Sequence, residues 1–177
     1  MTDPADTFEI AVRYDDDLRE QVKEGATDPL GWIDVIRGGD KPLVGGEHEE
    51  GMREYLTSLF GGLLQALMGC VAGNDEILRT GNGPLYIVFE PADDETISVS
   101  ICYSKRSAHS PAQREAYEPS VTVRAEPLVN ELVDRATEFE AFVADVNPQL
   151  AADSSDYRGL REDIDRLRDV YRSDRSR

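Results

Sequence analysis

The chain has 177 residues, with 36 acidic side chains against 19 Lys and Arg, which gives a formal net charge of −17 at pH 7. This length fits one domain, and a hydrophobic content of 40% excludes a wholly disordered chain. Nucleic-acid binding is disfavoured, because phosphate contacts dominate that affinity and need a basic surface. We therefore expect a folded domain whose partners are not nucleic acids.

The basic residues are unevenly divided, since Lys23, Lys41 and Lys105 are the only lysines. An acidic surface of this strength repels itself in dilute buffer, and molar salt shortens the Debye length to about 3 Å and screens that repulsion. Scarce lysine with abundant aspartate resembles proteins of halophiles that accumulate salt, and an arginine-rich bacterial genome is the alternative source. In a halophile, the overall charge is a solvent adaptation and says little about a partner.

No targeting or membrane segment is expected. The first six residues are polar and acidic, where a secretory signal needs a basic and then an apolar stretch. The longest apolar run, Leu59–Gly73, contains Gln65 and is shorter than the roughly 20 residues that a bilayer requires. These features predict a cytoplasmic protein that does not bind membranes.

The residues that usually hold metals or cofactors are few and scattered. Cys70 and Cys102 lie far apart in apolar stretches and are predicted to be buried free thiols. A disulfide or a metal pair is the alternative, and it would require a geometry that a sequence does not supply. His48 lacks the second histidine of an HExxH motif, since Met52 stands at that position. No metal, dinucleotide or phosphate-loop motif is found, so we expect no cofactor.

The N-terminal half alternates between strand and helix patterns. Phe8–Tyr14 and Trp32–Arg37 have the period-2 alternation of strands, and Gly38-Gly39-Asp40 predicts a hairpin turn before Leu43-Val44. A long helix is expected from Glu47 to Ala72. Small residues recur on that helix and suggest that another backbone approaches closely; they are Gly62, Ala66, Gly69 and Gly73.

The second half supplies more strands and then helices. A loop is expected at 74–84, and Leu85–Glu90, Thr96–Ser104 and Ser120–Ala125 read as strands. Lys105–Pro119 has no apolar periodicity and is expected to be a mobile loop. Pro127 then begins a helix that ends at Asn147-Pro148. A last helix carries an apolar stripe, which consists of Tyr157, Leu160, Ile164, Leu167 and Tyr171.

This order predicts an α+β fold with a mostly antiparallel sheet of about five or six strands. A long central helix and two C-terminal helices would pack on one face of that sheet. Residues 1–150 form the expected single α+β domain, and residues 151–177 form a C-terminal amphipathic helix and a loose tail.

No nucleophile, paired catalytic acid and base, or metal-ligand spacing stands out, which favours a binding function over catalysis. Two acidic tips are the candidate partner-binding residues, because local negative charge can steer a basic partner. They are Asp15, Asp16 and Asp17 in one segment and Asp93, Asp94 and Glu95 in the other.

The layout also resembles small immunity proteins that neutralise polymorphic toxins. The residues behind this resemblance are the Gly31-Trp32 strand, the central helix and the block from Ile97 to Pro148, in which Val121-Thr122-Val123 leads into a helix with Phe139 and Phe142. The resemblance implies a stoichiometric inhibitor that binds a cognate toxin and has no active site. It carries over no interface residue, so the candidates above rest on charge alone.

Two other functions remain open. A small-molecule-binding or enzymatic domain would place its site under the 105–119 loop, with Arg106, Arg114 and Tyr117 as contacts. A scaffold or homo-oligomer would assemble through the apolar stripe of the C-terminal helix.

Overall fold

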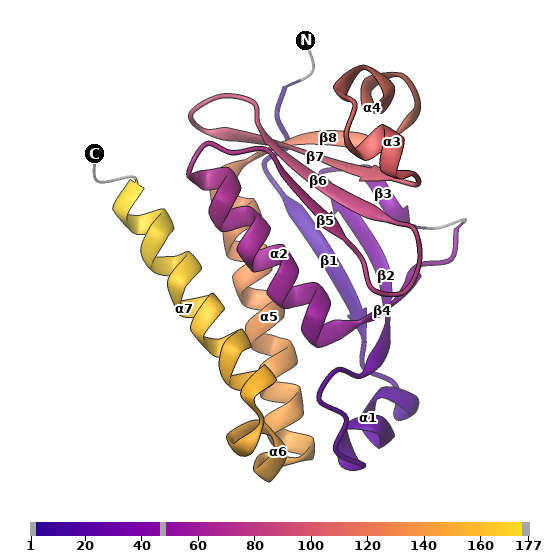
Figure 1. The fold of residues 1–177 in the computed structure, drawn as a ribbon, viewed down its shortest axis with the longest axis vertical. Helices are drawn as coiled ribbons and strands as arrows, with labels where there is room; N and C mark the ends of the chain where they lie inside the picture. The colour runs from indigo at the N-terminus through magenta and orange to yellow at the C-terminus, as the bar shows by residue number, and fades with distance from the viewer. Residues whose placement is uncertain (1–2, 47–48, 175–177) are drawn as a thin grey trace.

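Two antiparallel four-stranded sheets lie beside three long helices in the computed structural model, which describes residues 3–46 and 49–174 (Figure 1). The strands are β1 (Phe8–Arg13), β2 (Leu30–Gly38), β3 (Lys41–Gly45), β4 (Met52–Tyr55), β5 (Glu76–Arg79), β6 (Tyr86–Pro91), β7 (Thr96–Cys102) and β8 (Ser120–Arg124). The helices are α1 (Asp16–Lys23), α2 (Leu56–Val71), α3 (Lys105–Ala108), α4 (Pro111–Tyr117), α5 (Ala125–Val146), α6 (Pro148–Asp153) and α7 (Ser155–Asp174). The predicted α+β class is therefore confirmed.

The first sheet is built around β2, which pairs with β1 on one edge and with both β3 and β4 on the other. Ile10, Ile33 and Ile36 are buried. Ile33 and Ile36 are three positions apart and both face inward because the β1–β2 register shifts at Asp34, which departs from the strict alternation that the sequence predicts. Trp32 and Asp34 lie on the opposite face and are half-buried. The hairpin predicted around Gly38–Asp40 is confirmed as the β2–β3 connection.

The second sheet has the order β5-β6-β7-β8. The three predicted strands 85–90, 96–104 and 120–125 are confirmed as β6, β7 and β8, with small differences at their ends. Residues 74–84 were expected to be a loop, but four of them form β5, because Glu76–Arg79 pairs along β6.

Eight strands in two sheets replace the single sheet of five or six strands that was expected. The outer edge of β1 is closed because the Ile10 N–H donates to the Glu131 carboxylate of α5, at 2.9 Å. The outer edge of β8 is occupied by Ala5, which forms an isolated bridge with Val123. The two sheets are therefore not joined through the β1 and β8 edges.

The central helix is shorter than predicted. Met52–Tyr55, placed in the helix by sequence, forms β4 because these residues pair with Leu30–Ile33 of β2. The sequence predicts an acidic first turn of this helix that starts at Glu47. Glu47 and His48 lie outside the described residues. The helix α2 begins at Leu56 and ends at Val71, close to the predicted end.

The small residues of α2 make room for β5, which confirms the predicted close approach. A Cβ atom added at Gly62 would lie 2.5 Å from the Leu78 Cδ1 atom. One added at Gly69 would lie 2.0 Å from the Glu76 Oε1 atom. A larger side chain at either position would therefore require the Leu78 or the Glu76 side chain to move.

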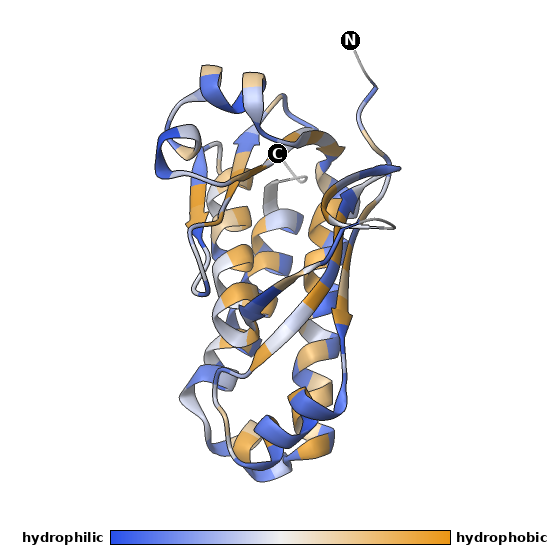
Figure 2. Cartoon of the chain, turned by 90° about the vertical axis from the view of Figure 1, so that its right-hand side faces the viewer, coloured by the Kyte–Doolittle hydropathy of each residue, from blue (hydrophilic) through white to orange (hydrophobic). Residues whose placement is uncertain are grey.

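The long helices α2, α5 and α7 pack side by side and share one hydrophobic core with both sheets. Phe139 of α5 lies between two aromatic rings, at 5.6 Å from Phe60 and 6.2 Å from Tyr157. The Tyr157 hydroxyl donates to the Ala26 carbonyl at 3.0 Å. Figure 2 shows hydrophobic residues concentrated along the long helices and the strands beside them.

The apolar stripe of α7 belongs to that core, since Tyr157, Leu160, Ile164 and Leu167 are all buried. The helix continues to Asp174, and residues 175–177 of the predicted tail lie outside the described residues. Among the helices of residues 3–46 and 49–174, none combines the length and the apolar character needed to cross a bilayer.

Candidate functional site

The first acidic tip is part of the α1 N-terminus. The Asp15 carboxylate caps this helix by accepting a hydrogen bond from the Leu18 N–H at 2.9 Å. Asp16 and Asp17 occupy the first turn, where negative charge suits the helix dipole. Asp17 also forms an ion pair with Arg53 at 3.2 Å. The helix cap and the ion pair within the chain therefore account for the acidic side chains of Asp15 and Asp17.

The second acidic tip is the β6–β7 turn. The Asp93 carboxylate accepts the Glu95 N–H at 2.8 Å, and this hydrogen bond lowers the pKa of Asp93. Glu95 lies 3.9 Å from Arg124, and Asp94 is exposed. The Asp93 carboxylate thus stabilises the turn in which it lies.

The structure does not bring the two tips together. The tip Asp15–Asp17 lies at the end of the molecule where α2 begins, whereas Asp93 and Asp94 border Gly73, beyond the end of α2 (Figure 1). The 16 residues of α2 span about 24 Å at the helical rise of 1.5 Å per residue. The six predicted residues therefore form two separate charged ends rather than one surface.

Residues 105–119 are not the irregular loop that was expected, since they contain α3 and α4. Val88, Cys102 and Ala108 form a small buried cluster between these helices and the second sheet. This cluster fills the sheet face under the segment, so the space predicted for a ligand beneath it is occupied by side chains.

Arg114 fastens the α3–α4 segment, which covers this part of the second sheet, to β6. Its side chain is 6% exposed and pairs with the Glu90 carboxylate. Its guanidinium also donates to the carbonyl oxygens of Ser107 and Ala108. Arg106 and Tyr117, the other two predicted contacts, are exposed, and Tyr117 is 77% exposed. The three residues therefore do not converge on one site.

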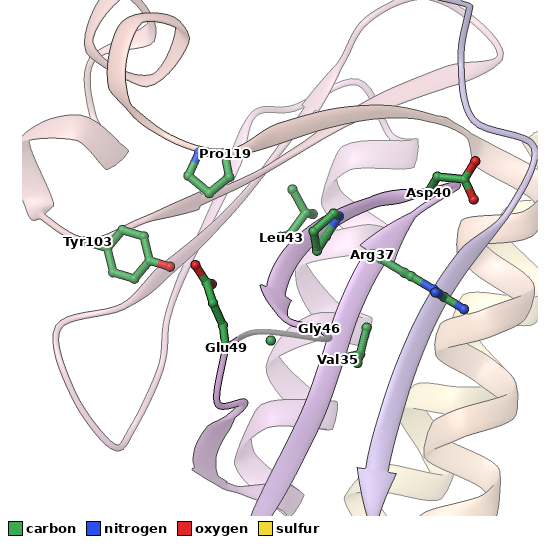
Figure 3. Close-up of a pocket in the computed structure, with 10 residues that line it drawn as sticks. Val35, Arg37, Asp40, Leu43, Gly46, Glu49, Tyr103 and Pro119 are labelled. Carbon is green, nitrogen blue, oxygen red and sulfur yellow. The ribbon is translucent and has the colours of Figure 1, made fainter.

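A hollow of about 840 Å³ lies beside this cover, between the two sheets (Figure 3). The first sheet and the segment after it contribute Val35, Pro42, Leu43 and Glu49, and the residues after β7 and before β8 contribute Tyr103 and Pro119. The sheets touch next to the hollow, where a Cβ atom added at Gly38 would lie 2.7 Å from both Cγ atoms of Val121. Their separation beyond that contact creates the hollow.

The two ends of the hollow differ in their charged groups. At one end, the side chains of Tyr103 and Glu49 point toward each other (Figure 3). At the other end, Arg37 points away from them and forms an ion pair with Glu9 at 2.5 Å. Burial raises the pKa of Tyr103, and the negative charges of Glu49 and Glu118 raise it further. The Tyr103 end is therefore electronegative.

A tryptophan ring flanked by two arginine side chains lies nearby on the open face of the first sheet. The guanidinium carbons of Arg13 and Arg53 lie 5.3 and 5.5 Å from the centre of the Trp32 ring. Trp32 faces Arg13 on β1 and Arg53 on β4, so the three side chains form a row across the sheet. Sequence reasoning did not select this row, although a lone tryptophan in an alternating strand was a usable signal.

Neither cysteine is among the described residues that line the hollow. Burial raises the pKa of Cys70 to about 12 and that of Cys102 to about 11, and both thiols are free and buried, as predicted. Across residues 3–46 and 49–174, no three His, Cys, Asp or Glu side chains gather in a way that could hold a metal ion. The hollow combines an apolar floor with an aromatic and acidic rim, a combination suited to binding.

No protein-family model, curated protein or solved structure matches this chain.

Proposed function

We propose that this chain is a non-enzymatic protein-binding domain, and that it acts in the cytoplasm as an immunity or antitoxin-like inhibitor of a cognate toxin. The observation that carries the proposal is the open hollow between the sheets, with its apolar floor and its exposed tyrosine. Tyr103 is 57% exposed, although most large apolar and aromatic side chains of the described chain are covered.

The residue types around the hollow support this proposal. Protein interfaces are enriched in tyrosine, tryptophan and arginine, and these residues carry much of the binding energy at hot spots. Tyr103 is exposed at the mouth of the hollow, and the Trp32 row lies on the adjoining sheet face. A partner that covered both regions would bury aromatic and arginine side chains together.

The locally concentrated acidic residues, rather than the overall charge, support a basic partner. Carboxylates gathered in a small area attract a positively charged protein, provided that salt does not screen them fully. The two acidic tips would then guide the partner rather than anchor it, because Asp15 and Asp93 are engaged in local hydrogen bonds. An origin in a halophile is part of the proposal and rests on the lysine-poor composition.

Coexpression with the product of the neighbouring gene, followed by affinity purification at high salt, tests the function. We expect a one-to-one complex and protection of cells from the neighbouring toxin. Purification of the chain alone, with no protection against that toxin, would contradict the proposal.

A small-molecule site is the second candidate, because a hollow of about 840 Å³ lies within the roughly 300–1,000 Å³ that ligand pockets occupy. Native mass spectrometry of the purified chain distinguishes the two functions. A stoichiometric organic molecule that is lost on unfolding favours the ligand site, and a bare chain that binds its partner with full affinity favours the protein interface.

A homo-oligomer through α7 is the third candidate. Four of the five residues of its apolar stripe are buried within this chain. Contacts with a second copy would therefore have to use the outer face of the helix. Light scattering of the full chain tests it, and a monomer at all concentrations would end the idea.

A further inference from the structure

The charged side chains that line the hollow differ in whether they form an ion pair. Its cation, Arg37, is paired with Glu9. Its anions, Asp40 and Glu49, are exposed and have no ion-pair partner among residues 3–46 and 49–174. The Glu49 carboxylate points toward the Tyr103 side chain across the mouth of the hollow (Figure 3). The group that could complete this arrangement is therefore a cation.

An arginine or lysine side chain has the chemistry that this end can recognise. A cation within about 6 Å of an aromatic centroid is attracted by the ring, and a neighbouring carboxylate adds a charge-assisted hydrogen bond. The methylene stem would lie along the apolar floor, which Pro42, Leu43 and Pro119 provide. The chain already contains this type of contact, since two guanidinium groups flank the Trp32 ring.

The neighbouring strand edge favours recognition of a side chain over addition of a strand. The strand β3 ends its sheet, and edge strands can pair with an incoming peptide. However, Pro42 lies within β3 and has no backbone N–H to donate, and Lys41 adds a charge at the same edge. A partner segment would therefore bind mainly through a side chain inserted into the hollow.

We infer that the hollow binds an arginine or lysine side chain from a basic segment of a partner protein, with the Tyr103 ring and the Glu49 carboxylate as the recognition groups. This inference rests on the proposed protein-binding function and adds the chemistry of the partner.

A titration with small probes tests the inference without the partner. Nα-acetyl-arginine methylamide is added to the ¹⁵N-labelled chain, in the lowest KCl concentration at which circular dichroism shows a folded protein. We expect saturable shifts of the amide signals of Gly45, Gly46 and Ser104. Nα-acetyl-norleucine methylamide, which has a similar stem but no charge, should bind about tenfold more weakly.

Substitutions then assign the binding to its two groups. Tyr103→Ala and Glu49→Gln should each weaken binding of the arginine probe by about two- to fivefold, and the double variant should weaken it by about four- to twenty-fivefold. Two matched controls remove the same groups elsewhere. Tyr117→Ala removes an exposed tyrosine that does not line the hollow, and Asp94→Asn removes an exposed carboxylate at the distant turn. Both controls should retain wild-type affinity.

The two proposals fail in distinguishable ways. Equal affinity in the double variant, or shifts that spread over the acidic surface without saturating at the hollow, would overturn the cation-binding inference. A complex with the neighbouring gene product would stand in that case. Absence of such a complex would contradict the immunity function, whereas the probe titration reports on the hollow itself.

Discussion

Replacing Arg114 with methionine should destabilise the chain, because this side chain fastens the α3–α4 cover to the second sheet. Its guanidinium pairs with Glu90 and donates to two carbonyl oxygens of α3. Breaking a buried ion pair by removing one partner costs about 3–5 kcal/mol. The Glu90 side chain is 25% exposed, so water recovers part of its solvation. We expect a loss of about 2 kcal/mol in the free energy of unfolding.

Urea unfolding in high salt, followed by circular dichroism, measures this loss. The double variant Arg114→Met/Glu90→Gln should recover about half of it, because no unpaired carboxylate remains at the sheet face. Arg106→Met is the matched control, since Arg106 is exposed on the same segment, and it should change stability by less than about 0.5 kcal/mol. Wild-type stability of Arg114→Met would refute the structural role and return Arg114 to the candidate ligand contacts.

Three further predictions concern salt, thiols and pH. Raising KCl from 0.1 to 2 M should stabilise the chain by about 2 kcal/mol, or ~4–8 °C in Tm, through screening of its net charge of −17; calorimetry that shows no increase would contradict this. Cys70 and Cys102 should resist Ellman's reagent at pH 8 until the chain unfolds, since burial raises both pKa values; labelling of the folded chain would be inconsistent with it. Burial also raises the pKa of Glu131, so the folded state favours its protonated form and loses stability as pH rises through that pKa. Glu131→Gln keeps an acceptor for the Ile10 N–H and should gain stability relative to wild type between about pH 4 and 7, with no difference below pH 4; a pH-independent difference would argue against this origin.

The strands and helices with long, regular patterns could be predicted from the sequence. The alternation in β7 and the stripe of α7 each extend over enough residues to specify an element and its buried face. The short strands β4 and β5 could not be predicted, because four residues carry too little periodicity. Glu54 adds to the difficulty, since it is 2% exposed and its carboxylate accepts backbone N–H groups from Tyr55 and Asn82.

The candidate site depends even more on tertiary structure. Glu49 and Tyr103 are separated by more than 50 positions, and they meet only because the sheets touch at Gly38 and Val121 and then separate. Charge was the signal available for choosing partner-binding residues, and it selected helix-capping and turn-forming carboxylates. The exposed tyrosine at the end of a strand was the more useful signal.

The affinity of the chain for its neighbouring gene product tests the central claim most directly. Isothermal titration calorimetry in high salt should give a one-to-one complex with the wild-type chain. The variant Tyr103→Ala/Glu49→Gln should bind at least about tenfold more weakly, and Tyr117→Ala/Asp94→Asn should bind with the wild-type affinity. Absence of any heat of binding, together with unprotected cells, would contradict the protein-binding function. A complex whose affinity is the same in all three chains would place its interface outside the hollow.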